Sequence, residues 1–233
     1  MIIWIASYPR SGNTLLRLLI KHYYGLRTYS IYQDSELAQS PFVVNLIGHA
    51  SRPISIDAMK LAEEVYLVKT HELPDDESPA VCLVRDGRDA LVSYAHYILS
   101  YERETASQAQ DEQLFHTLRD LILYNASFGG WGPNVLAWAR RSSPTSIIKF
   151  EDLAAAADPL PIVNRALDKI GFSTVVPVAS GKPPSFDELH RQMPQFFRVG
   201  KIGGWRDEMP SELLKLFWER NHRAMDPIGY ADA

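Results

Sequence analysis

Residues 2–21 read IIWIASYPRSGNTLLRLLIK and open with a short apolar, β-branched run typical of a buried strand. A tight turn of proline, serine and glycine follows in residues 7–14. After the turn, a set of residues recurs at the spacing of one helix face: Leu15, Leu18, Leu19 and His22. A strand, a small-residue loop and a helix in this order direct backbone N–H groups at an anion. The stretch therefore predicts a phosphate-binding loop.

The loop differs from the P-loop pattern G-x-x-x-x-G-K-[ST] in an informative way. Gly12 and Thr14 fit the pattern, but Ser7 replaces its first glycine and Asn13 replaces its lysine. The positive charge lies earlier, at Arg10. Such a loop can bind a phosphate but is poorly equipped to hold the γ-phosphate of a nucleoside triphosphate. On the loop alone, an ordinary strand–turn–helix junction without a ligand stays open.

Composition narrows the class of protein. The chain has 233 residues, of which 46% are hydrophobic, so residues 1–233 suffice for one α/β domain with its own core. The net charge of −4 argues against bulk nucleic-acid binding. The single cysteine, Cys82, predicts a reducing compartment. No apolar run reaches membrane-spanning length and no basic leader precedes the first strand, so we expect a cytoplasmic protein without a span.

A second apolar run, residues 65–68, leads directly into Lys69 and His71. In open α/β sheets, ligands bind outside the carboxyl ends of the strands. His71 is therefore a candidate general base beside the phosphate loop, since an imidazole accepts a proton near neutral pH. A purely structural histidine is the alternative.

The third predicted strand, residues 80–84, ends at Arg85, and the helix that follows carries Ser93. A guanidinium group and a hydroxyl that meet at one point suit a terminal phosphate. Ser93 fits an exposed helix serine equally well. Arg88 and Asp89 are expected to cap the helix or to pair on the surface.

The remaining elements follow from periodicity. A fourth strand is predicted at residues 146–150, and helices at 57–64 (capped by Asp57), 113–124, 134–141, 160–170, 185–193 and 210–224. Trp131 and Trp138 are expected in the core. Residues 26–55 show no clear period; they are read as a lid or a pocket wall, or else as a surface excursion. Residues 196–206 are rich in glycine and basic groups, and a mobile loop that closes on an anion is predicted there.

Five segments, taken together, resemble the sulfotransferase family, whose members use 3′-phosphoadenosine 5′-phosphosulfate (PAPS). They are YPRSGNT at 8–14, KTHELP at 69–74, RDGRDALVSY at 85–94, FEDL at 150–153 and RVGKIGGW at 198–205. The likeness runs in order from Trp4 to about Tyr230. It implies an α/β fold with a central parallel sheet flanked by helices, in a topology like that of the P-loop NTPases. It also implies an enzyme of the EC 2.8.2 class.

The resemblance also implies roles for individual residues. His71 is expected to be the general base, Arg10 to stabilise the leaving phosphate and Lys69 to orient the sulfuryl group. Phe186 is expected to offer adenine an aromatic face, because Leu15 replaces the family's tryptophan. The other expected nucleotide contacts are Ser11, Gly12, Asn13 and Thr14 in the first loop, Arg85 and Ser93 at the 3′-phosphate, and Arg198, Val199 and Gly200 in the late loop. The product would be PAP, adenosine 3′,5′-bisphosphate, and no metal is expected.

Two other classes remain open at this point. A P-loop kinase or NTPase needs a lysine where Asn13 stands, and a non-catalytic nucleotide-binding module would not need both His71 and Arg10. The acceptor is not readable: a small molecule, a glycan, a lipid or a peptide is compatible with a pocket bordered by Tyr94, His96, Tyr97 and residues 29–48. O- versus N-sulfation and the oligomeric state also stay open.

Overall fold

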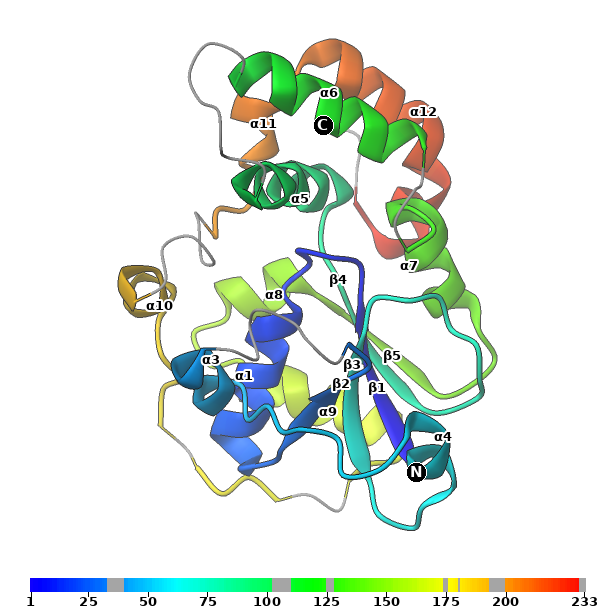
Figure 1. Ribbon diagram of the computed structural model, residues 1–233, viewed down its shortest axis with the longest axis vertical. Coiled ribbons are helices and arrows are strands. Elements are labelled where there is room, and N and C mark those ends of the chain that lie inside the picture. The colour runs from blue at the N-terminus through cyan, green and yellow to red at the C-terminus, as the bar shows by residue number, and fades with distance from the viewer. Residues whose placement is uncertain are drawn as a thin grey trace.

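A parallel β-sheet of five strands, in the order β2-β3-β1-β4-β5, forms the centre of the molecule (Figure 1). The computed structural model describes residues 1–32, 40–101, 110–124, 128–173, 176–179, 181–192 and 200–230. The strands are β1 (Ile2–Ser7), β2 (Thr28–Ser30), β3 (Tyr66–Thr70), β4 (Ala80–Val84) and β5 (Thr145–Lys149). The α/β fold with a central parallel sheet is therefore confirmed.

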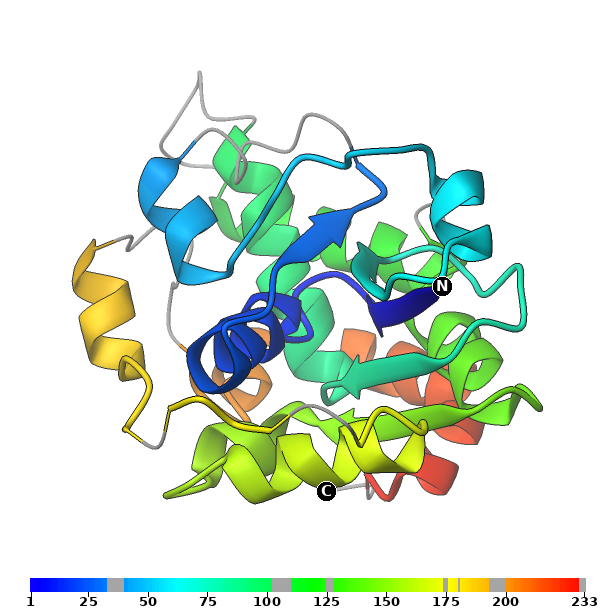
Figure 2. The same ribbon diagram turned by 90° about the horizontal axis from the view of Figure 1, so that it is seen from below.

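Helices cover both faces of the sheet. They are α1 (Asn13–Tyr24), α3 (Pro41–Leu46), α4 (Ile56–Leu61), α5 (Gly87–Tyr101), α6 (Gln110–Leu123), α7 (Trp131–Arg140), α8 (Phe150–Ala155), α9 (Leu160–Lys169), α10 (Phe186–Gln192), α11 (Trp205–Glu208) and α12 (Ser211–Ile228). In Figure 1, α5, α6, α7 and α12 gather on one side, and α1, α8 and α9 lie on the other. Figure 2 shows α9 alongside β5 at one edge of the sheet.

The central strand β1 supplies side chains to two separate cores. All six of its residues are buried, as expected for a parallel strand covered on both faces. Because side chains alternate along a strand, Trp4 and Ala6 pack into the core beneath α5, α7 and α12. Ile3 and Ile5 pack into the core beneath α1 and α9. The middle of the sheet is thus a rigid support for the loop that follows β1.

The two tryptophans of the α7 region lie in the core, as predicted, with 1% exposure each. Their indole N–H groups also tie this helix to the ends of two strands. Trp131 donates to the carbonyl of Arg85 at 3.2 Å, and Trp138 donates to the carbonyl of Glu72 at 3.0 Å. These bonds fix the backbone where β4 and β3 end.

Cys82 lies in the middle of β4 and is buried. Burial in apolar surroundings raises the pKa of its thiol to about 12, because a thiolate would lose its hydration there. The thiol is therefore uncharged at neutral pH.

Several features differ from the sequence-based prediction. Phe150, predicted as the end of a strand, begins α8, and α11 begins at Trp205 within the predicted loop of residues 196–206. β2 is a short edge strand in the segment that showed no period, and its few residues are too polar for an apolar pattern to reveal them. α3 in the same segment was also not predicted. α4 begins after Ser55, whose hydroxyl accepts the N–H of Ala58 at 3.2 Å, so the predicted cap at Asp57 is wrong. Among the described residues, no helix is long and apolar enough to cross a membrane.

Candidate functional site

The loop between β1 and α1 turns back sharply at the carboxyl end of the central strand. Arg10 and Gly12 have φ angles of 62° and 95°, in the left-handed region that favours glycine. A Cβ atom at position 12 would lie 2.5 Å from Cδ2 of Phe150, so the site also excludes a larger residue by contact. Residues 10–12, Arg-Ser-Gly, therefore adopt a tight turn that places the start of α1 close to β1.

The amino end of α1 opens onto this loop without a cap. Within the described residues no side chain caps it, and no acidic residue lies in its first turn. The first backbone bond of the helix runs from Leu16 N–H to the carbonyl of Gly12, at 3.2 Å. The preceding N–H groups, at residues 13–15, have no carbonyl partner in the described part of the chain. Free N–H groups and the helix dipole together favour an anion here.

Asn13 stands where a P-loop has its lysine, and its side chain turns inward. Its amide nitrogen donates to the carbonyl of Ile5 at 2.9 Å and to the hydroxyl of Ser7 at 3.2 Å. The side chain thus braces the loop against β1, and only the backbone of Asn13 is left to meet a ligand.

Arg10 reaches across from the loop to α5. Its Nε donates to the hydroxyl of Ser93 at 3.2 Å, and its guanidinium carbon lies 5.2 Å from the centre of the Tyr97 ring. The structure therefore brings together two residues that the resemblance assigns to different phosphates.

Arg85 extends from the end of β4 and joins two loops. One guanidinium nitrogen donates to the carbonyl of Arg10 at 3.3 Å, and the other donates to the carbonyl of Lys201 at 3.0 Å. The guanidinium carbon lies 4.8 Å from the centre of the Phe150 ring. Arg85 is thus held against the phosphate loop and against the segment that begins at Gly200.

Arg88 and Asp89 lie in the interior, each with 3% exposure, so the predicted surface position is wrong. The carboxylate of Asp89 accepts the N–H groups of Gly203 at 2.7 Å and of Trp205 at 2.9 Å. Arg88 pairs with Asp86 at 2.8 Å and stacks over Trp205 at 4.1 Å. Both side chains hold the segment that starts at Gly200. The apolar pattern of α5 alone does not reveal these contacts with a distant part of the chain.

His71 lies just beyond β3 with its ring held by the backbone of β1. Nδ1 lies 2.7 Å from the carbonyl oxygen of Ser7, which only accepts hydrogen bonds. Nδ1 therefore carries the proton, and in the neutral ring Nε2 keeps its lone pair. Tyr32 stacks on the ring at 5.9 Å, and Phe128 packs edge-on at 5.6 Å.

Burial and neighbouring cations control the charge of the two groups at the end of β3. Burial, then the charge of Lys69, lowers the pKa of His71 to about 3, although the Ser7 carbonyl opposes this. Burial, then the charges of Arg17 and Arg10, lowers the pKa of Lys69 to about 7. The imidazole is consequently neutral at neutral pH, and an anion nearby would restore the positive charge of Lys69.

One cavity of about 770 Å³ gathers most of the predicted site residues. Its lining includes Arg10, Gly12, Asn13, Thr14, Lys69, His71, Arg85, Ser93, Phe186 and Gly200. Of the residues predicted for the acceptor, Tyr94 and Tyr97 also line it, whereas His96 does not and instead pairs with Glu208. Ser11 is fully buried and is not part of the lining. Arg198 and Val199 lie outside the described residues.

Other lining residues include Phe128, Lys182 and Lys201, which the sequence prediction did not name, and Tyr32, which it covered only within the range 29–48 offered for the acceptor pocket. Phe128 follows a stretch without a regular pattern, so no sequence signal marks it. Lys201 lies within the predicted glycine-rich loop, and its charge was the available signal. The described residues contain no cluster of side chains able to hold a metal ion.

Sequence comparison identifies relatives for nearly the whole chain. The family model for the sulfotransferase domain matches residues 2–229. Mouse sulfotransferase 1E1 is 22% identical, over 95% of this chain and 82% of its own. Flavonol 3-sulfotransferase of Flaveria bidentis is 24% identical, over 94% and 81%. WSCD family member CG9164 of Drosophila melanogaster is 29% identical over a shorter region, 64% of this chain and 44% of its own.

Solved structures share the fold. Mouse sulfotransferase SULT7A1, complexed with PAP, superposes with a TM-score of 0.63 at 17% identity, covering 96% of this chain and 83% of that one. Retinol dehydratase, in complex with androsterone and PAP, gives a TM-score of 0.55 at 21% identity, covering 96% and 80%. Because the family model matches residues 2–229, nearly the whole chain with its central parallel sheet, this chain belongs to the sulfotransferase family.

Proposed function

We propose that this enzyme transfers the sulfuryl group of PAPS to a hydroxyl or amine of an acceptor, with His71 as the general base. One observation carries the proposal: a neutral imidazole with a fixed tautomer shares a cavity with an uncapped helix N-terminus and the cations Arg10 and Arg85. PAP in the two related crystal structures supports the choice of nucleotide.

The residues present fit a nucleotide with two separated phosphates. The N–H groups at the start of α1, with Arg10, would hold the 5′ side, where PAPS supplies the sulfuryl group and PAP departs. Arg85 and Ser93 would hold the 3′-phosphate, an assignment that the resemblance extends to Arg198 and Val199. Phe186 lies at the cavity and would meet the adenine, and a Cβ atom at Gly200 would lie 2.4 Å from its ring.

His71 would take the proton from the acceptor at Nε2. The bond from Nδ1–H to the Ser7 carbonyl orients the ring and stabilises the imidazolium that forms. A pKa of about 3 makes a weak base; burial is the first cause, and the charges of Lys69, Arg17 and Arg10 lower the pKa further. A bound phosphate offsets those cations and raises the pKa of His71, so the base gains strength when the nucleotide is in place.

Arg10 and Lys69 would balance the negative charge that grows on the leaving group. Arg10 keeps its charge at any physiological pH, whereas Lys69, with a pKa of about 7, gains or loses its charge near neutral pH. Asn13 occupies the position of the P-loop lysine, and its side chain bonds inward to the carbonyl of Ile5. No lysine is therefore present at that position to hold a γ-phosphate, which argues against a kinase. We place the enzyme in the cytoplasm on its single, buried cysteine.

Thermal unfolding tests the nucleotide assignment. PAP is expected to raise the melting temperature well above the shift given by ATP with magnesium, because only PAP has a 3′-phosphate for Arg85 and Ser93. Equal or larger protection by ATP would contradict the proposal. An acceptor screen with radiolabelled PAPS then tests the transfer itself.

A further inference from the structure

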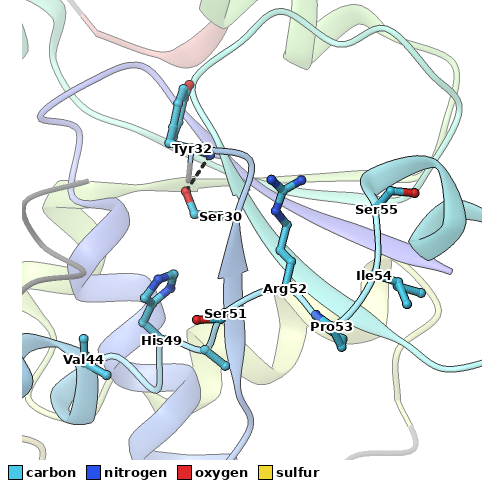
Figure 3. Close-up of a pocket in the computed structure, with 10 residues that line it drawn as sticks. Ser30, Tyr32, Val44, His49, Ser51, Arg52, Pro53, Ile54 and Ser55 are labelled. Carbon is cyan, nitrogen blue, oxygen red and sulfur yellow. Dashed lines mark hydrogen bonds between the residues drawn. The ribbon is translucent and has the colours of Figure 1, made fainter. Parts of the chain in front are cut away.

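A second cavity, of about 560 Å³, lies at the end of β2 (Figure 3) and shares Tyr32 with the first. Its lining consists of Ser30, Tyr32, Val44 and the continuous segment of residues 49–55. Figure 3 shows the Arg52 side chain projecting from that segment towards the level of Ser30 and Tyr32. The sequence prediction covered this segment only as part of residues 26–55, which were read as a lid or a pocket wall or else as a surface excursion, and it named none of residues 49–55 individually.

Among the described residues, the lining of this cavity has one cation, Arg52, and no carboxylate. Arg52 is partly buried, and it makes no hydrogen bond or ion pair with the described part of the chain. The lining also contains His49 and three serine hydroxyls, those of Ser30, Ser51 and Ser55. A guanidinium group among hydroxyls is a typical binding site for a carboxylate or a phosphate.

His49 also lines this cavity. Its Nδ1 lies 3.1 Å from a guanidinium nitrogen of Arg17, which can only donate. Nδ1 is therefore the acceptor, and Nε2 of the neutral ring carries the proton.

Arg17 adds positive charge behind the cavity. It is buried, and its hydrogen-bond partners in the described part of the chain are both neutral: the hydroxyl of Thr28 at 2.9 Å, and His49. Burial lowers the pKa of Arg17 to about 9, which shows how poorly its charge is compensated. An anion in the adjoining cavity would supply the missing compensation.

Tyr32 connects the second cavity to the first, since its side chain lines both. Its hydroxyl accepts the backbone N–H of His71 at 3.0 Å, and its own N–H is held by Ser30 at 3.1 Å. The hydroxyl also donates to Glu72 at 3.2 Å, but that carboxylate is not part of the second cavity's lining. A molecule extended past Tyr32 would thus have one end at His71 and the other near Arg52.

We propose that the second cavity binds the anionic end of the acceptor, so that the preferred acceptors carry a carboxylate, sulfate or phosphate away from the group that is sulfated. The inference rests on the proposed function, because it extends the same active site. Arg52 forms the ion pair, and His49 and the serine hydroxyls complete the contacts. A neutral acceptor leaves Arg52 without a counter-charge.

A series of phenols tests this directly. The probes are ω-(4-hydroxyphenyl)alkanoic acids with one to six methylene groups, each paired with its methyl ester. Their dissociation constants are measured by calorimetry on the protein saturated with PAP, so that the nucleotide site is already filled. The same pairs are then assayed for turnover with PAPS. The variants are Arg52→Gln, Arg52→Lys, and Arg27→Gln as a control in another loop.

The wild-type protein is expected to bind at least one acid about tenfold or more tightly than its ester. Arg52→Gln removes that preference while ester binding and PAP binding stay within about twofold, Arg52→Lys keeps part of it, and Arg27→Gln keeps all of it. The inference is overturned if no acid is preferred at any length, or if Arg52→Gln weakens acid and ester alike. Failure of PAP to bind would instead overturn the proposed function.

Discussion

The carbonyl oxygen of Ser7 lies 2.7 Å from Nδ1 of His71, and the two residues are 64 positions apart in the chain. The contact exists because β1 and β3 are parallel neighbours in which Ala6 pairs with Thr70. The loop that would hold the nucleotide and the base that would act on the acceptor are therefore positioned by the same strand pair.

Replacing His71 by alanine is expected to lower sulfate transfer by about 10²–10⁴-fold, because the acceptor loses its general base. Binding of PAP should change by less than about threefold, since the ring does not hold a phosphate in the proposed site. Initial rates with labelled PAPS and calorimetric titration of PAP measure the two effects. His116→Ala, on the half-exposed face of α6, is the control. Normal turnover in His71→Ala would remove this residue from its role.

The lowered pKa of Lys69 leads us to expect that PAP binding is linked to proton uptake. The pKa of Lys69 is about 7 in the free protein, and a bound anion raises it. Above pH 7 the complex then binds more protons than the free protein, so affinity falls by as much as about tenfold per pH unit. Titrations between pH 7.5 and 9.5 should show this slope. Lys69→Met should flatten it, and Lys215→Met, an exposed lysine of α12, should leave it unchanged. An equally steep slope in Lys69→Met would contradict the assignment.

The same lysine makes stability depend on pH. The unfolded state binds a proton at Lys69 below its ordinary pKa of 10.5, whereas the folded state does so only below about 7. Between these values the unfolded state holds more protons, so stability rises as pH rises from 7 to 10.5 and is lost as pH falls. Chemical denaturation of the wild-type protein and of Lys69→Met across this range should give curves that converge at high pH. Parallel curves would argue that the lysine is more hydrated than its surroundings indicate.

Asp89→Asn tests the attachment of the segment that begins at Gly200. The carboxylate accepts two backbone N–H groups and lies 3.7 Å from Arg85, so its loss should cost about 2–4 kcal/mol of unfolding free energy. PAP affinity should fall with it, because Arg85 donates to the carbonyl of Lys201 in that segment. Urea denaturation and PAP titration measure both effects. Asp120→Asn, on the exposed side of α6, is the control, and matching behaviour of the two variants would count against this role.

Gly12→Ala separates backbone strain from a side-chain clash. Gly12 has a φ of 95° and a Cβ atom there meets Phe150 at 2.5 Å, while Gly171 has a φ of 79° and open space. Gly171→Ala should therefore cost only the left-handed conformation, about 1–2 kcal/mol. Gly12→Ala should cost a further 1–3 kcal/mol or so and weaken PAP binding. Denaturant midpoints of both variants provide the comparison, and Gly12→Ala/Phe150→Leu should recover part of the loss. Equal costs for the two glycine variants would show that the ring of Phe150 yields.

The sequence predicted those parts of the structure that local patterns determine. β1, β3, β4 and β5 are short apolar or β-branched runs, and the long helices show a regular apolar period, so their existence was confirmed. β2 has three residues, and its first, Thr28, bonds to Arg17 and to the carbonyl of Ile47. The position of β2 in the sheet depends on these distant partners, so no periodicity in the local sequence predicted this strand.

The candidate site divides in the same way. Loop motifs located Arg10, His71 and Arg85, and the structure brings their side chains to one cavity. The environment of each group was not predictable from spacing. Asp89 reads as a surface residue of a helix until Gly203 and Trp205 are seen to donate to it. Tyr32 lies in a segment without pattern, yet it contacts His71 and lines both cavities.

The buried thiol in β4 offers a practical reporter. At neutral pH, Cys82 is both protonated and shielded, so an alkylating reagent meets it only when the sheet opens. Because it is the single cysteine of the chain, the rate of its modification in excess reagent measures that opening at one known point. A second cysteine introduced on the surface could be labelled with a fluorophore while the native thiol stays untouched.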